Sequence, residues 1–142
     1  MKKYKVGYTQ GVYDMFHIGH LNLINHAKEY CDYLIVGINS DRLVEEYKHK
    51  HTVINETERA LIVKNIKAVD DVIIADTLDK EETLSKIHYD AIFIGDDWKG
   101  SDRWNATEEA LAKHGVDVVY LKHTDGISST ILRVVEENAI KD

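Results

Sequence analysis

Short apolar runs recur along the chain and alternate with segments whose apolar residues are spaced three or four apart. The runs are rich in Val, Ile and Tyr, a composition that predicts buried β-strands. Five such runs are present, at residues 4–8, 33–38, 72–74, 91–94 and 116–121.

The segments between the runs have the spacing of helices that bury one face. Strands that alternate with helices predict an α/β fold: a doubly wound, Rossmann-like parallel sheet of five strands with helices on both faces. The expected buried helical positions are Leu21, Ile24, Ala27 or Lys28 and Cys31; Leu61, Ile62, Ile66 and Val69; Trp104, Thr107, Leu111 and His114; and Ile131, Val134, Val135 and Asn138.

Length and composition predict one compact domain over residues 1–142, since 44% of the 142 residues are apolar. No apolar run approaches the roughly 20 residues of a membrane span, and Met1-Lys2-Lys3 leads straight into a strand-like segment. We therefore expect a cytoplasmic protein without membrane insertion. Cys31 is the only cysteine, which excludes an internal disulfide and favours a buried thiol.

A net charge of −7 argues against a broad surface for nucleic acid. Any anionic ligand therefore has to bind at a local group of donors or cations. Ligands of doubly wound sheets bind beyond the C-terminal ends of the strands, where the strand order reverses. Three loops that follow strands carry unusual residues: 9–20, 95–100 and 123–130.

The first of these loops places His17 and His20 three residues apart where a helix should begin, so both rings lie on nearly the same face. Gly19 leaves room for a ligand, and the helix start favours a phosphate. Two imidazole donors over one anion are typical of phosphoryl or nucleotidyl transfer. The alternatives are histidines that only cap and pack the helix, or a zinc site with Asp14 that lacks an obvious fourth ligand.

The last loop, HTDGISST at residues 123–130, also combines a glycine with hydrogen-bond donors at an expected helix start. Gly126 permits a tight turn, and Ser128, Ser129 and Thr130 offer hydroxyls and backbone N–H groups at the start of a helix. A simple Ser/Thr helix cap is the alternative. Two phosphate-binding loops together suit a triphosphate, which spans more than one helix terminus.

Taken together, these loops resemble the nucleotidyltransferase superfamily and, within it, the cytidylyltransferases. The family pattern Gly-x-x-Asp-x-x-His-x-Gly-His falls on residues 11–20, and Arg-Thr-Glu-Gly-Ile-Ser-Thr-Thr falls on residues 123–130. Gly95-Asp96-Asp97-Trp98 with Gly100 further resembles the bacterial glycerol-3-phosphate cytidylyltransferases. The similarity extends through nearly the whole chain.

The resemblance implies that the phosphate of a small alcohol phosphate, such as glycerol 3-phosphate, attacks the α-phosphorus of CTP in line. Pyrophosphate leaves, and a CDP-alcohol forms without a covalent enzyme intermediate. The resemblance also implies Mg²⁺ with the triphosphate, a homodimer, and a role in making cell-wall precursors such as those of teichoic acid.

Site residues follow from the same resemblance, and no metal ligands are expected on the protein itself. Lys48 and Lys50 match two family lysines once one residue is inserted, and Arg59 matches an arginine at the next helix start. The expected catalytic residues are His17, His20, Lys50 and Arg59. The nucleotide is expected to contact Val12, Tyr13, His17, His20, Lys50, Asp97, Trp98, His123, Thr124, Gly126, Ile127, Ser128, Ser129 and Thr130. The acceptor is expected to contact Asp14, Lys48 and Lys80.

Other interpretations of these residues stay open. The cations could belong to an ordinary solvated loop, and Trp98 could cap the core. His123 stands where the family has arginine, and Asp125 where it has glutamate. Choline, ethanolamine or sugar phosphates are alternative acceptors, an adenylyltransferase is an alternative enzyme, and a non-catalytic nucleotide-binding or sensing domain is the alternative outside enzymes.

Overall fold

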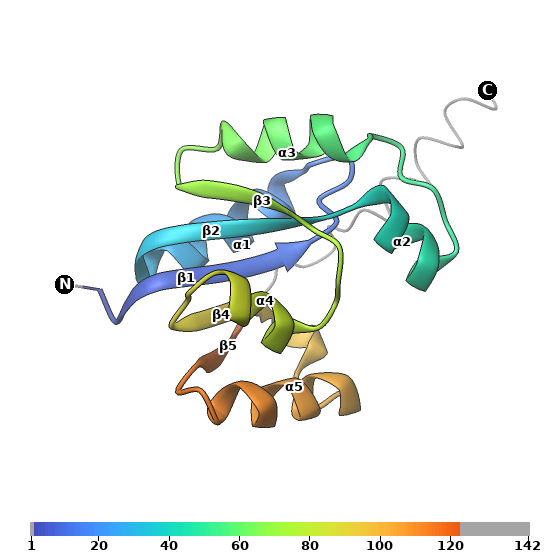
Figure 1. Cartoon of the computed structure of the whole chain (residues 1–142). Helices are drawn as coiled ribbons and strands as arrows, with labels where there is room; N and C mark the ends of the chain where they lie inside the picture. The colour runs from blue at the N-terminus through green and yellow to red at the C-terminus, as the bar shows by residue number, and fades with distance from the viewer. Residues whose placement is uncertain (1, 123–142) are drawn as a thin grey trace.

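A computed structural model describes residues 2–122 of the chain. Strands and helices alternate as the sequence predicts (Figure 1). In chain order, the elements are β1 (Tyr4–Gly11), α1 (Ile18–Glu29), β2 (Cys31–Asn39), α2 (Asp41–Lys48), α3 (Glu56–Lys64), β3 (Asp71–Ala75), α4 (Lys80–Lys86), β4 (Ala91–Gly95), the short 3-10 helix η1 (Asp96–Trp98), α5 (Asp102–Ala112) and β5 (Asp117–Leu121).

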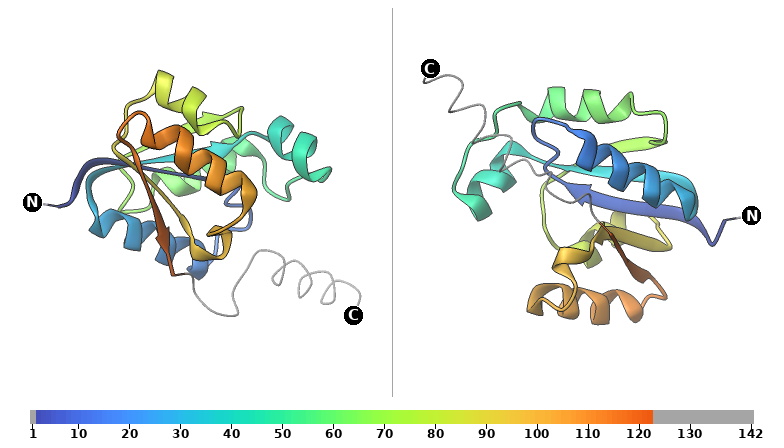
Figure 2. Two further views of the ribbon diagram at one scale, coloured as in Figure 1. Left: turned by 90° about the horizontal axis from the view of Figure 1, so that it is seen from below. Right: turned by 180° about the vertical axis from the view of Figure 1, so that it is seen from behind.

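All five strands are parallel, in the order β3-β2-β1-β4-β5. The chain moves outward from β1 to β3 and then crosses back to β4 and β5, so the order reverses between β1 and β4. Figure 2 shows α1 on one side of the sheet and α4 and α5 on the other. The doubly wound α/β fold is thereby confirmed. No helix among residues 2–122 is long and apolar enough to cross a membrane.

Each described α-helix begins at a polar side chain that accepts a backbone N–H of its first turn. Such caps satisfy donors that the helix itself leaves without partners. The capping residues are His17, Ser40, Asn55, Asp79 and Ser101.

Side chains of β2 alternate between two apolar clusters, one on each face of the sheet. Leu34, Val36 and Ile38 join a cluster with Ile24 of α1 and Val63 of α3. On the opposite face, Ile35 joins a second cluster that contains Trp104 and Leu111 of α5. This alternation is the period of two that a strand imposes on its side chains.

Tyr8 crosses closely over the backbone of the neighbouring strand. Its ring stacks on Tyr89 with centroids 4.9 Å apart. A Cβ at position 37 would lie 2.1 Å from the Tyr8 hydroxyl, so only glycine fits there. The contact brings the Tyr8 hydroxyl to Gln10, whose Oε1 accepts its hydrogen bond at 2.6 Å.

Three details of the predicted helices were wrong. Cys31 begins β2, where it pairs with Tyr4, and does not end α1; it is fully buried, as expected. In α3, Leu61 and Ile62 are 60% and 40% exposed, because the helix turns Arg59 and Val63 inward instead.

Other predicted positions lie outside the helices that the structure forms. Ile66 and Val69 pack against the core beyond the end of α3, and the exposed His114 lies beyond α5. The helices α2 and α4 lack the apolar spacing from which the other helices were predicted, since each is short and mostly polar. The last group of expected buried positions lies outside the described residues: Ile131, Val134, Val135 and Asn138.

Candidate active site

The point where the strand order reverses lies between β1 and β4. The ladder between these strands pairs Gly7 with Ala91 and Tyr8 with Ile92. Beyond the ladder, the Thr9 hydroxyl donates to the carbonyl of Phe93 at 2.8 Å. The β1–α1 loop and η1 leave the sheet at this edge, which is where doubly wound sheets bind ligands.

The β1–α1 loop has an unusual backbone. Tyr13 and Met15 have φ angles of 52° and 50°, in the left-handed region that non-glycine residues rarely adopt. Between them, the buried carboxylate of Asp14 accepts the backbone N–H groups of Val53 and Ile54 at 2.8 and 2.9 Å. The strained loop is therefore tied to the segment between α2 and α3.

His17 and His20 meet at the start of α1. The N–H of Gly19 donates to Nδ1 of His17 at 3.0 Å, and the N–H of His17 donates to Nδ1 of His20 at 3.3 Å. The two rings stack with centroids 3.8 Å apart and planes 26° apart. Because each Nδ1 accepts a backbone proton, each neutral ring carries its own proton on Nε2.

The surroundings keep both rings neutral. Burial and then the neighbouring His17 lower the pKa of His20 to about 4, although Asp14 opposes this shift. Burial also lowers the pKa of His17. At neutral pH the site thus offers two uncharged Nε2–H donors, an arrangement suited to stabilising negative charge that develops on a phosphate oxygen.

Arg59 lies near the start of α3, at a helix start as expected, and its side chain lies inside the fold instead of in a solvated loop. Its side chain is fully buried. Nη1 donates to the carbonyls of Val12 and Asn39, at 2.7 and 2.9 Å. Nε donates to the carbonyl of Ile54 at 2.8 Å, and Nη2 pairs with Asp41 at 2.6 Å. These contacts join the β1–α1 loop, the end of β2 and the α2–α3 segment, so the structure gives Arg59 a positioning role.

Lys48 and Lys50 flank the end of α2. His49 closes that helix with φ 55°, which places the exposed Lys50 in the following segment. The ammonium of Lys48, also exposed, lies 5.7 Å from the ring centroid of Tyr47. Further along the same segment, Asp14 holds Val53 and Ile54 beside the β1–α1 loop.

Remaining predicted contacts fall into three groups. Asp97 and Trp98 are exposed on η1, as a ligand contact requires. Tyr13 is buried, with its hydroxyl 3.4 Å from that of Thr9, and Val12 is half-buried. His123, Thr124, Gly126, Ile127, Ser128, Ser129 and Thr130 lie outside the described residues.

Lys80 is neither solvated nor in an ordinary loop. It is 5% exposed at the first position of α4, and Nζ donates to the carbonyl of Leu78 at 2.7 Å. Burial, and then the charge of Arg103, lower its pKa to about 8. The sequence analysis did not single out Arg103, and it assigned Trp104 only to the core.

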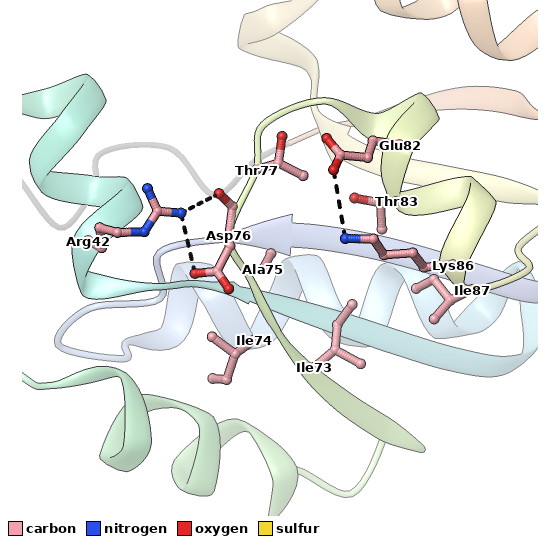
Figure 3. Close-up of a pocket in the computed structure, with 10 residues that line it drawn as sticks. All are labelled: Arg42, Ile73, Ile74, Ala75, Asp76, Thr77, Glu82, Thr83, Lys86 and Ile87. Atoms are coloured by element: carbon pink, nitrogen blue, oxygen red, sulfur yellow. Dashed lines mark hydrogen bonds and ion pairs between the residues drawn. The ribbon is translucent and has the colours of Figure 1, made fainter.

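A separate cavity of about 450 Å³ lies between β3, α4 and the start of α2 (Figure 3). Its cations are already paired: Arg42 lies 3.6 Å from the Asp76 carboxylate, and Lys86 lies 3.7 Å from Glu82. Neither histidine lines it. We therefore place the candidate site beyond the C-terminal ends of β1 and β4, and not in this cavity.

No three His, Cys, Asp or Glu side chains within residues 2–122 gather closely enough to hold a metal ion. The Asp14 carboxylate, the third member of the alternative zinc site, accepts two backbone N–H groups.

Comparison with known proteins identifies the family. Residues 8–135 match the family described as cytidylyltransferase-like. The chain belongs to this family and is a nucleotidyltransferase.

Individual relatives cover most of the chain. It is 35% identical to the glycerol-3-phosphate cytidylyltransferase of Staphylococcus aureus, over 88% of this chain and 89% of that protein. It is 30% identical to the ethanolamine-phosphate cytidylyltransferase of Dictyostelium discoideum, over 96% of this chain and 39% of that protein. A lipopolysaccharide core biosynthesis protein from Thermoplasma volcanium shares the fold, with a TM-score of 0.74 and 24% identity over 86% of this chain and 99% of that one.

Proposed function

We propose that this protein transfers CMP from CTP to glycerol 3-phosphate and releases pyrophosphate. The observation that carries the proposal is the stacked pair of neutral histidines at the start of α1, beside the reversal point of the sheet. The similarity to the Staphylococcus aureus enzyme over nearly the full length of both chains supports the choice of nucleotide and acceptor.

In the proposed reaction, a phosphate oxygen of the acceptor attacks the α-phosphorus of CTP. A new P–O bond forms, the bond from the α-phosphorus to the bridging oxygen breaks, and its electrons leave with pyrophosphate. Positioning and charge neutralisation carry most of such a transfer. The Nε2–H donors of His17 and His20 hydrogen-bond to the α-phosphate oxygens, where negative charge increases in the transition state.

The remaining residues would hold the substrates around this centre. Lys50 would neutralise the triphosphate and Lys48 the acceptor phosphate, while Asp14 and Arg59 hold the loops that carry them. Mg²⁺, bound as part of the CTP complex, would screen the charge of the triphosphate. Asp97 and Trp98, with the segment 123–130, would contact the nucleotide.

A grid of pyrophosphate-release assays tests the proposal. CTP, ATP, GTP and UTP are each combined with glycerol 3-phosphate, phosphocholine, phosphoethanolamine and a sugar phosphate, in the presence of Mg²⁺. We expect turnover with CTP and glycerol 3-phosphate. Turnover only with ATP would identify an adenylyltransferase, and CTP binding without pyrophosphate release from any pair would identify a nucleotide-binding domain.

The family resemblance also leads us to propose a homodimer and a cytoplasmic location, where CTP is available. Apolar side chains that a second copy could cover are exposed on α3 and on the edge strand next to it. They are Leu61, Ile62 and Ile74, which are 60%, 40% and 39% exposed.

A further inference from the structure

Polar side chains follow the apolar cluster on the α4 and α5 face of the sheet, toward the end where the strands finish. Tyr8 belongs to that cluster, and Gln10 lies on the same face of β1 because side chains of a strand alternate between faces. Asn39 ends the neighbouring strand β2. These residues and two further tyrosines form a group that we call the tyrosine–amide network: Tyr8, Gln10, Asn39, Tyr47 and Tyr89.

The hydrogen bonds of the network run in one direction across three elements. The Tyr8 hydroxyl donates to Oε1 of Gln10 at 2.6 Å. Nε2 of Gln10 donates to Oδ1 of Asn39 at 2.8 Å, and Nδ2 of Asn39 donates to the Tyr47 hydroxyl at 3.0 Å. Bonds in such a chain polarise and strengthen one another. The chain starts in β1, crosses β2 and ends in α2, one residue before Lys48.

A second branch of the network holds the segment between β3 and α4 (Figure 3). Nε2 of Gln10 also donates to the carbonyl of Thr77 in this segment, at 3.0 Å. Tyr89, whose ring stacks on Tyr8, donates from its hydroxyl to the carbonyl of Lys80 at 2.7 Å. The network therefore holds the start of α4 at two carbonyls, one of them that of Lys80 itself.

Both branches lead to a lysine that lies over an aromatic ring. The ammonium of Lys48 is 5.7 Å from the ring centroid of Tyr47, and the ammonium of Lys80 is 5.5 Å from that of Trp104. A cation over an aromatic face gains an attraction that favours this position. The segments that carry these two cations are both held by one side chain, that of Gln10.

Stability alone does not account for so many polar groups inside the fold. Apolar side chains of the same shape can replace both partners of a buried hydrogen bond at little net cost. A fully satisfied polar network adds instead one defined arrangement of its parts. The Gln10 amide is satisfied in this way, since Oε1 accepts one bond and Nε2 donates two. It cannot turn without losing contact with at least one of the segments that it joins.

We propose that Gln10 is a positioning residue, which sets how the segments that carry Lys48 and Lys80 lie relative to each other. Its action is indirect, through the backbone of one segment and through Asn39 and Tyr47 in the other. That the two lysines meet the acceptor rests on the proposed function. Loss of the Gln10 amide leaves both lysines present but releases their segments, and a displacement of about 1 Å can lower a rate about 10²-fold.

Two tyrosines of β1 provide a matched pair of variants. Tyr8→Phe keeps the ring but removes the hydroxyl that holds Gln10. Tyr4→Phe removes a hydroxyl at the other end of the strand, where it donates to Asp117 at 2.7 Å outside the network. We expect the KM for glycerol 3-phosphate to rise about threefold in Tyr8→Phe and about tenfold in Gln10→Leu, with the KM for CTP unchanged. Tyr4→Phe should change neither constant.

Two kinetic results would contradict the positioning role. One is an acceptor KM that stays at the wild-type value in both Tyr8→Phe and Gln10→Leu. The other is a KM for CTP that rises as much as that for the acceptor, because this would show general damage to the site.

Hydrogen exchange tests the network without turnover. The N–H of Thr83 closes the first turn of α4, and the N–H of His49 closes the last turn of α2. In Gln10→Leu and Tyr8→Phe we expect both amides to exchange faster, while amides in the middle of β1 and β2 keep their wild-type rates. Unchanged exchange at both amides, or faster exchange throughout the chain, would refute the proposal.

A double-mutant cycle tests the branch through α2. Tyr47→Phe keeps the ring beside Lys48 but removes the acceptor of the Asn39 amide. Residues of one hydrogen-bond network are coupled, so the effects of Gln10→Leu and Tyr47→Phe on the acceptor KM should not add. The effects of Gln10→Leu and Tyr4→Phe should add. Additive effects in the first pair would show that Gln10 does not act on Lys48.

These outcomes separate the positioning role from the proposed function. No pyrophosphate release from any pair of substrates would refute the reaction, and the exchange rates would then decide by themselves whether Gln10 holds the two segments. Wild-type turnover, together with unchanged constants and exchange in the variants, would refute the positioning role and leave the cytidylyltransferase.

Discussion

His17 and His20 hold each other at the start of α1: their rings stack at 3.8 Å, and the backbone N–H of His17 donates to Nδ1 of His20. The arrangement sets the tautomer of each ring, so that Nε2 carries the proton and is the donor. It also makes both residues part of the helix cap.

Substitution of either histidine should therefore affect turnover far more than stability. We expect His17→Ala and His20→Ala to lower kcat by about 10²–10³, as loss of a transition-state donor does. Loss of the cap should reduce the free energy of unfolding by about 1 kcal/mol. Steady-state kinetics and urea unfolding of the same preparations check both values, and wild-type turnover in either variant would refute the catalytic role.

The low pKa of His20 predicts how stability depends on pH. Its pKa falls from 6.5 in the unfolded chain to about 4 in the fold. Between these values the unfolded state binds more protons, so stability rises with pH from 4 to 6.5, by at most about 1.4 kcal/mol per pH unit for one group.

The measurement is urea unfolding of the wild type and His20→Asn at pH 5 and pH 7. Asparagine can still accept the His17 N–H but does not titrate. The difference in stability between the two pH values should shrink in the variant. An unchanged difference would show that other groups cause the pH dependence.

Arg59 should be among the residues on which stability depends most. Arg59→Met leaves three backbone carbonyls without the Arg59 donor and removes one of the donors to the Asp41 carboxylate. We expect a loss of about 3–5 kcal/mol, because each carbonyl left without a donor inside the fold costs about 1–3 kcal/mol. Lys64→Met, an exposed cation on the same helix, is the control and should change the urea midpoint little.

Asp14 should act through the loop that it holds. Asp14→Asn keeps the size of the side chain but replaces one acceptor oxygen by a donor, so the N–H of Val53 or Ile54 loses its partner. The loss of one such bond destabilises by about 1–3 kcal/mol. We also expect faster hydrogen exchange at these two amides, and unchanged exchange there would contradict the tether.

The proposed dimer predicts a concentration-dependent mass. Leu61→Glu places a charge at a side chain that is 60% exposed, so it should not disturb the fold of one chain. It should shift the sedimentation coefficient from that of a dimer to that of a monomer. A variant that still sediments as a dimer would exclude this face as the interface.

Local pattern was enough to predict much of this protein. The sequence predicts five strands that run parallel, and two histidines that lie on one face because they are three residues apart. These features depend on neighbours in sequence and on the general rules of α/β sheets. The expected position of the site also followed, because loops after parallel strands meet at one edge.

Tertiary structure alone decided where the cations lie. Arg59 and Lys80 appear in polar segments of the sequence, yet both are buried, because partners from distant segments accept their hydrogen bonds or cover their side chains. The meeting of Lys80 with Arg103 and Trp104 depends in the same way on packing between α4 and α5. Burial of a charge is a property of the three-dimensional neighbourhood, and no spacing along one segment determines it.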